Sequence, residues 1–192
     1  MGGAALLEVP PFEKRGDIGV ESVCASLGDP AETARALERL LPESPDYSFD
    51  DTVGGGSVAQ GDSDYTADCF VSGDDGVLLS VRTEMILVGP PGSTPEGWEA
   101  EALGASGSDE GESFAAGSKG VTSAGGAAVL VPCTEPGTVP GGSYSLSLVV
   151  DRKQAAREDD SGVRKGLADL AVGAARYSHE KAGCDLPSEL SS

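Results

Sequence analysis

Four cysteines are the residues of this chain whose number and spacing point most directly to chemistry, and that chemistry is disulfide formation. Cys24, Cys69, Cys133 and Cys184 lie far apart in the sequence. No two of them form the closely spaced Cys-x-x-Cys pair typical of metal and redox sites. Their even number favours disulfides, the alternative being four buried free thiols. Disulfides would imply an oxidising compartment.

Four cysteines allow three pairings, and the expected elements favour Cys24–Cys69 together with Cys133–Cys184. Each of these bonds would tie a helix end to the first strand of the adjacent hairpin. Each would close a long loop, which is worth about 4 kcal/mol in the chain-entropy model. The nested pairing, Cys24–Cys184 with Cys69–Cys133, would link both helices and both hairpins and stays open as an alternative.

The remaining residues do not suggest catalysis. A Ser-His-Asp or Cys-His mechanism would have to use His179, the only histidine. That residue falls near the exposed end of the last expected helix, where a favourable interaction with the helix dipole is its expected role. Pairs such as Asp50-Asp51 and Asp74-Asp75 arise by chance among 32 acidic residues, so no glycosidase dyad can be selected. We therefore expect no catalytic residues.

No metal or cofactor site is expected either. Residues 62–68 superficially match the start of a calcium loop, but Ala67 stands where glycine is required. Gly73 stands where the loop needs a bidentate glutamate. The three glycines at 54–56 lack the Lys-Ser/Thr and the following helix of a phosphate-binding loop.

Two helices and two hairpins are expected to position the cysteines. Asp29 as N-cap, Pro30 at the first helical position and Glu32 in a capping box predict a helix to about residue 41. A longer helix is expected over residues 162–182, after a cap at 159–161. Alternating apolar residues predict strands over residues 65–71, 77–87, 127–133 and 144–150.

The alternation also predicts which side chains face the core. In the strand over residues 77–87, Val77 is expected on the core face with Leu79, Val81 and Met85, opposite Ser80, Arg82 and Glu84. In the last strand, Ser145 and Ser147 are the polar residues of a half-buried pattern.

These elements predict an α+β fold, with an antiparallel sheet of four or five strands and two helices on one face, stapled by disulfides. Residues 1–23 are expected to form an N-terminal arm or edge strand, and residues 24–184 a single domain. Residues 88–120 read as a long loop insertion, with Trp98 and Phe114 as its apolar anchors. Residues 185–192 are expected to be a frayed C-terminal tail.

Charge limits the classes of partner. The chain carries 32 acidic and 13 basic residues, a net charge of −19. Such a surface repels nucleic-acid phosphates and anionic lipid headgroups, which argues against nucleic-acid binding and against membrane binding through a basic patch. No export signal or membrane-spanning segment is visible, since residues 1–7 are too short for a signal core and lack a basic start. We expect any membrane anchor to lie outside this sequence.

Two segments carry a resemblance to a known class of proteins. The chain lacks asparagine and has only two isoleucines, as expected of a GC-rich genome. Cys24-Ala-Ser-Leu-Gly-Asp-Pro-Ala-Glu, with a second cysteine about 45 residues on, resembles actinobacterial cell-envelope lipoproteins and secreted domains of unknown function. Ala128-Val-Leu-Val-Pro-Cys133, residues 145–150 and the helix ending Ala182-Gly-Cys184 are similar to a pattern of actinomycete membrane-anchored proteins. The resemblance implies an extracytoplasmic location and pairing of the first cysteine with one in the sheet.

The expected function follows from location rather than from a reaction. We expect an extracytoplasmic domain, secreted or anchored to the outer face of the membrane, that serves as a non-enzymatic binding or interaction module. Its partner would be an envelope protein or a small ligand. Two alternatives are a small-molecule or lipid carrier with a pocket between sheet and helices, and a hydrolase that uses two carboxylates facing one cleft.

Overall fold

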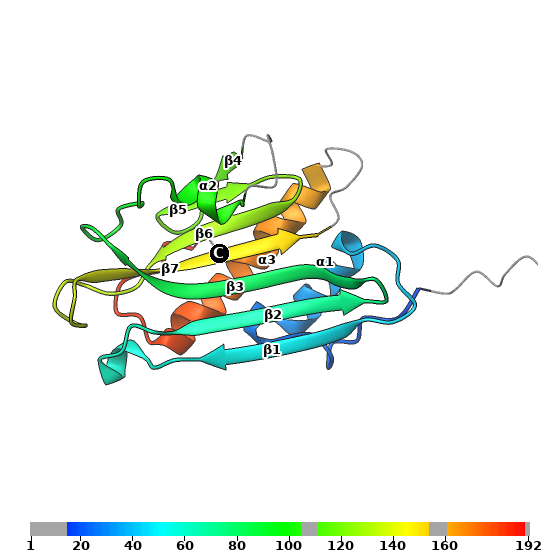
Figure 1. Cartoon of the computed structure of the whole chain (residues 1–192), viewed down its shortest axis with the longest axis horizontal. Coiled ribbons are helices and arrows are strands. Elements are labelled where there is room, and N and C mark those ends of the chain that lie inside the picture. Colours follow the sequence, from blue (N-terminus) through cyan, green and yellow to red (C-terminus); the bar gives the residue numbers. More distant parts are fainter. Residues whose placement is uncertain (1–14, 105–110, 154–160, 191–192) are drawn as a thin grey trace, which may run out of the picture.

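A single antiparallel sheet of seven strands carries two helices on one face (Figure 1). The computed structural model describes residues 15–104, 111–153 and 161–190. The strands are β1 (Ser48–Gly54), β2 (Thr66–Gly73), β3 (Gly76–Val88), β4 (Glu112–Phe114), β5 (Lys119–Thr122), β6 (Gly126–Pro132) and β7 (Ser143–Arg152). Their order across the sheet is β1-β2-β3-β7-β6-β5-β4. Strands β1–β3 form one meander and β4–β7 a second, and the two meet where β3 pairs with β7.

The helices are a short 3-10 turn η1 (Ala25–Leu27), α1 (Pro30–Leu40), the turn η2 (Val58–Gln60), α2 (Trp98–Ala102) and α3 (Ser161–Ala182). The predicted start of α1 is confirmed, because the Asp29 carboxylate accepts hydrogen bonds from the backbone N–H groups of Ala31 and Glu32 at 3.0 and 2.9 Å. The expected cap of α3 at 159–160 lies outside the described residues.

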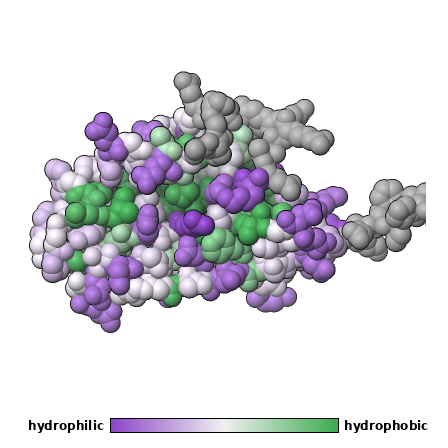
Figure 2. Space-filling view, viewed as in Figure 1, coloured by the Kyte–Doolittle hydropathy of each residue, from purple (hydrophilic) through white to green (hydrophobic). Residues whose placement is uncertain are grey.

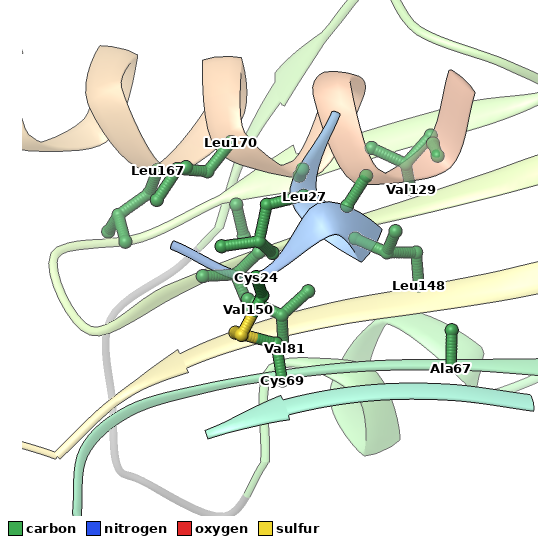
Figure 3. Packing of buried hydrophobic residues seen from close by; sticks show 14 of the residues in the cluster. Cys24, Leu27, Ala67, Cys69, Val81, Val129, Leu148, Val150, Leu167 and Leu170 are labelled. Carbon is green, nitrogen blue, oxygen red and sulfur yellow. A yellow bond between two sulfur atoms is a disulfide. The ribbon is translucent and has the colours of Figure 1, made fainter. Parts of the chain in front are cut away.

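The core lies between the sheet and the layer formed by η1, α1 and α3. Alternate residues of the central strands, such as Leu148 and Val150, face Leu167 and Leu170 of α3 (Figure 3). All four side chains are at most 3% exposed. Burial of this continuous apolar layer supplies most of the driving force for folding.

Close contact between α3 and η1 depends on glycine. A Cβ atom on Gly173 would lie 2.8 Å from the Leu27 carbonyl oxygen, and one on Gly166 would lie 3.1 Å from the end of the Leu40 side chain. The two glycines are seven residues apart in α3 and therefore lie on the same side of the helix. They let α3 approach η1 at one point and α1 at the other.

The sheet has more strands than the four or five that the sequence predicts. The additional strands are β1, between the first expected helix and the first expected strand, β4, within the expected insertion at 88–120, and β5, which begins at the end of that insertion. β1 is an edge strand whose side chains are mostly exposed, so it lacks the apolar alternation that reveals a half-buried strand. β4 and the four residues of β5 are too short to show a period.

The face opposite the two long helices is partly covered, which corrects the expectation for the last strand. Trp98 of α2 packs against Ala128 and Leu130 of β6, and its indole N–H donates to the Ser147 hydroxyl at 2.9 Å. Ser145 and Ser147 are consequently buried. Figure 2 shows this face, where apolar surface is interrupted by hydrophilic side chains. Trp98 therefore anchors its segment by packing, as its size suggests.

The prediction for Val77 was wrong. Val77 is 41% exposed, whereas its neighbour Leu78 is 3% exposed and joins the core. An irregularity between Val71 and Ser72 shifts the register of the β2–β3 pair near its turn, which interrupts the alternation of side chains between the two faces. Leu79, Val81 and Met85 lie on the core face as predicted.

Residues 15–23 and the segment after α3 are more closely attached to the rest of the fold than the sequence suggests. Residues 15–23 contain no strand, but Ile18 is buried and the N–H of Gly16 donates to the Ser44 carbonyl at 2.8 Å. At the other end, the N–H groups of Asp185 and Leu186 both donate to the Cys133 carbonyl. Residues 185 and 186, at the start of the expected tail, are therefore held to the end of β6.

Candidate functional site

Two disulfides fix the helix layer to the sheet. Cys24, just before η1, is bonded to Cys69 in β2, and Cys133, just after β6, is bonded to Cys184, just after α3. This is the pairing that the sequence favours, and the nested alternative is not formed. Each bond joins a helix end to a strand of its own meander.

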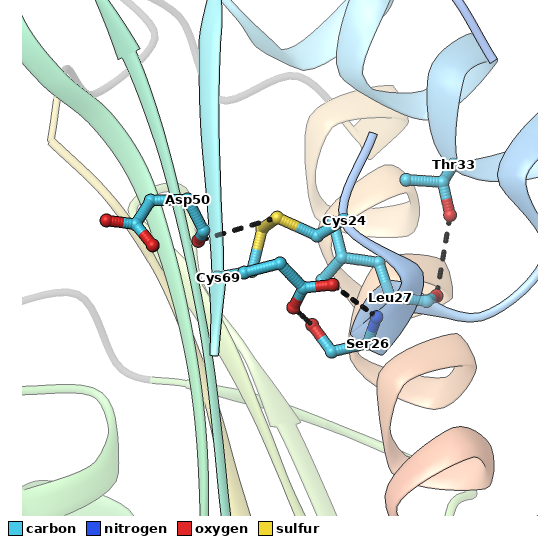
Figure 4. The surroundings of a disulfide bond; sticks show 7 residues. Cys24, Ser26, Leu27, Thr33, Asp50 and Cys69 are labelled. Atoms are coloured by element: carbon cyan, nitrogen blue, oxygen red, sulfur yellow. Dashed lines mark hydrogen bonds between the residues drawn. A yellow bond between two sulfur atoms is a disulfide. The ribbon is translucent and has the colours of Figure 1, made fainter. Parts of the chain in front are cut away.

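The first disulfide lies within a set of polar contacts that hold η1 against β1 (Figure 4). The Asp51 carboxylate accepts from both the hydroxyl and the backbone N–H of Ser26, at 2.5 and 3.2 Å. The Thr33 hydroxyl donates to the Leu27 carbonyl at 3.4 Å. One carboxylate of the Asp50-Asp51 pair therefore has a structural role in positioning the turn that precedes α1.

The second disulfide holds the C-terminal segment beside the end of β6. The Asp185 carboxylate accepts from the Glu135 N–H at 3.1 Å and from the Thr138 hydroxyl at 2.7 Å. His179 lies within this network, with Nε2 at 2.9 Å from the Leu186 carbonyl oxygen.

His179 lies in the last turn of α3 as predicted, but its ring is half-buried rather than exposed. Burial lowers the pKa of the imidazole from 6.5, although hydrogen bonds to the Leu186 and Pro132 carbonyls oppose the shift. The segment after α3 folds back over the ring, a contact that helix position alone does not reveal. The only histidine of the chain thus joins α3 to the C-terminal segment.

Three surface hollows adjoin α3 and form the candidate functional site. One hollow of about 370 Å³ lies between α1 and α3. A second of about 490 Å³ extends along the same helices to Phe114, and a third of about 420 Å³ lies between α3 and β4. Asp169 lines all three, so we treat them as one site, the α3 furrow.

Basic residues are concentrated in the α3 furrow. Five of the 13 basic residues line it but only four of the 32 acidic ones. The basic residues are Arg35, Arg39, Arg164, Lys165 and Arg176. The furrow therefore has nearly balanced charge, with a small basic excess, on a strongly acidic chain.

Some basic residues of the furrow form ion pairs and others do not. Lys165 pairs with Asp169 at 2.7 Å, and Arg164 pairs with Glu112 at 3.1 Å. Arg35 and Arg39 make no ion pair with any residue in the described ranges, and both are exposed. The Arg39 Nε donates to the Arg35 carbonyl at 3.0 Å, which leaves the terminal guanidinium nitrogens available to a ligand.

The furrow also offers apolar surface. Leu40 and Val163 contribute to the hollow between α1 and α3, and Phe114 and Val172 to the larger one. The Phe114 ring is seated against Gly120, where a Cβ atom would lie 3.1 Å from the ring. Apolar contacts beside a few charged groups are typical of small-molecule sites.

Sequence analysis did not identify this furrow. Its arginines come from α1 and α3 and its apolar residues from α1, α3 and β4, so only tertiary packing brings them together. One signal was available, because Arg35 and Arg39 are four residues apart on a helix in a chain with few basic residues.

The acidic residues considered as cation ligands have other surroundings. The Asp64 carboxylate accepts from the Gly56 N–H at 2.7 Å in the turn after β1. Within the described part of the chain, no three His, Cys, Asp or Glu side chains lie close enough together to hold a metal ion.

Comparisons with known proteins add no assignment. No family model, no curated protein and no solved structure matches this chain.

Proposed function

We propose that this chain is a non-enzymatic binding module that works outside the cytoplasm, with the α3 furrow as its binding site. The furrow itself carries this proposal. It combines exposed guanidinium groups with apolar surface on helices that both disulfides hold to the sheet. A site held on rigid elements loses little conformational entropy when a ligand binds.

The extracytoplasmic location is supported by the two disulfides, which suit an oxidising environment. Among the described residues, no helix is long and apolar enough to cross a membrane. The resemblance to actinobacterial envelope proteins agrees with this location.

A surface site is favoured over a carrier pocket between sheet and helices. The residues that would line such a pocket, including Leu148, Leu167 and Ala171, are completely buried against one another. A ligand in that layer would have to displace packed side chains, and changes of even one methylene group are felt in close-packed interiors. The α3 furrow needs no such rearrangement.

Chemical-shift mapping tests the proposal. A library of neutral and charged fragments, added to the ¹⁵N-labelled protein, should give hits whose shifts cluster at Ala36, Asp169 and Val172. An Ala168→Phe variant, which fills the furrow, should lose these hits. Ala100→Phe, the same change at an exposed position of α2, should retain them.

Two results would contradict the proposal. One is a set of hits that clusters on the opposite sheet face and is insensitive to Ala168→Phe. The other is robust turnover of a wall or peptide substrate that is abolished by changing a single acidic residue.

A further inference from the structure

We infer that the ligand of the α3 furrow is a compact anion with an apolar body, an inference that rests on the proposed function. Arg35 and Arg39 are separated by about one helical turn, roughly 6 Å along α1. Guanidinium groups bind carboxylates, phosphates and sulfonates through directed, charge-assisted hydrogen bonds. Neither arginine is neutralised by a carboxylate within the residues that the structure describes.

The apolar surface beside the arginines defines the rest of the ligand. Val172 and Phe114 are both partly buried side chains that line the larger hollow with Arg35 and Arg39. The hollow measures about 490 Å³, within the range of small-molecule sites. An aromatic or aliphatic body could therefore lie on α3 while its anionic group meets α1.

Charge outside the furrow sets the size of the ligand. Of the 32 acidic residues, 28 lie elsewhere in the chain, with only 8 of the 13 basic ones. A polyanion longer than the furrow would run over this acidic surface and be repelled. A ligand with one or two charges stays within reach of the arginines, because charge interactions at the surface are screened beyond about 8 Å at physiological ionic strength.

The dye 8-anilinonaphthalene-1-sulfonate is a suitable probe because it joins one sulfonate to an apolar aromatic body. Its fluorescence should rise saturably on titration with the native protein. The double variant Arg35→Gln/Arg39→Gln should raise the Kd at least tenfold, and Arg→Lys changes at the same positions should recover part of the affinity. Arg82→Gln is the matched control, since Arg82 is an exposed arginine stacked on Phe70 on the opposite sheet face.

The uncharged analogue N-phenyl-1-naphthylamine should bind more weakly than the sulfonate and be insensitive to the arginine changes. Near-ultraviolet circular dichroism confirms that each variant is folded, because the dye also binds partly unfolded chains. If the double variant is not folded, the single Arg35→Gln change serves in its place and should weaken dye binding by at least threefold.

The outcomes separate this inference from the proposed function. An unchanged Kd in the folded arginine variants, with loss of binding in Ala168→Phe, would overturn anion recognition but leave the furrow as a binding site. An unchanged Kd in all variants would overturn both. Tighter binding of heparin than of the dye, lost with the arginines, would overturn the compact ligand in favour of a polyanion.

Discussion

At the scale of single residues, His179 shows how a half-buried imidazole couples stability to pH. Burial lowers its pKa in the folded chain from 6.5. As the pH falls, the unfolded chain therefore binds the proton before the folded chain does. The contribution of the neutral ring is fully present above about pH 6.5 and is lost as the pH falls through the lower folded-state pKa.

We expect His179→Gln to remove this pH dependence. The free energy of unfolding of the native protein, measured in urea, should fall between pH 7.5 and 5.0 relative to that of the variant. Titration of the acidic residues affects both proteins equally and therefore cancels in this difference. Since the chain has one histidine, its ring protons can be followed individually by NMR. A titration midpoint at or above 6.5 in the folded protein would contradict the prediction.

At the scale of elements, the close contact between α3 and η1 should make replacement of a helical glycine by alanine destabilising, whereas this change is usually stabilising. Alanine normally stabilises a helix over glycine by about 1 kcal/mol. At Gly173 the added Cβ would lie 2.8 Å from a backbone oxygen of η1, an atom that cannot move aside as a side chain can. We expect Gly173→Ala to lower the free energy of unfolding by about 1–3 kcal/mol.

Gly166→Ala is the matched control for this change. Its Cβ would meet only side-chain atoms of Leu40, the nearest at 3.1 Å, and no backbone atom. Chemical denaturation should show a change of less than about 1 kcal/mol for this variant. Equal destabilisation by both substitutions would mean that backbone contact is not what distinguishes Gly173.

Trp98 gives a prediction for the covered part of the other sheet face. Trp98→Ala should release α2, so that the Leu103 amide, which donates to the Glu99 carbonyl, exchanges its hydrogen faster. Trp98→Phe keeps apolar packing and loses only the hydrogen bond to Ser147, at a cost of about 1 kcal/mol. Amides of α1, on the far side of the sheet, should be unaffected by either change, and faster exchange there would show that α2 supports the whole fold.

The elements also show what the sequence could and could not predict. Asp29, Pro30 and Glu32 predict α1 because they are local signals of a helix start. β1 was missed because an edge strand needs no apolar alternation, and Asp50-Asp51 resembles a turn. The furrow was missed because Arg39 and Asp169 are distant in sequence and meet only when α1 packs on α3.

At the scale of the whole molecule, the disulfides predict two separable losses of stability. Each closes a loop of similar length, since the bonded cysteines are 45 and 51 positions apart in the sequence. Replacing either pair with alanine should lower the free energy of unfolding by about 4 kcal/mol, a large share of the 5–15 kcal/mol typical of a domain. Denaturant titrations of the two double variants measure these losses.

Hydrogen exchange distinguishes the two variants. Removing Cys24 and Cys69 should increase exchange in η1 and α1, whereas removing Cys133 and Cys184 should increase it at residues 185–186. Identical exchange patterns would indicate that the bonds act only on the unfolded chain. In that case neither bond would fasten its own helix end.

Because neither bond crosses from one meander to the other, the order in which thiols become available matters. If the chain crosses a membrane with its N-terminus leading, Cys24 and Cys69 emerge before Cys133. An oxidant that simply joins consecutive thiols then yields the native bonds. Maturation of this protein should accordingly proceed without a disulfide isomerase.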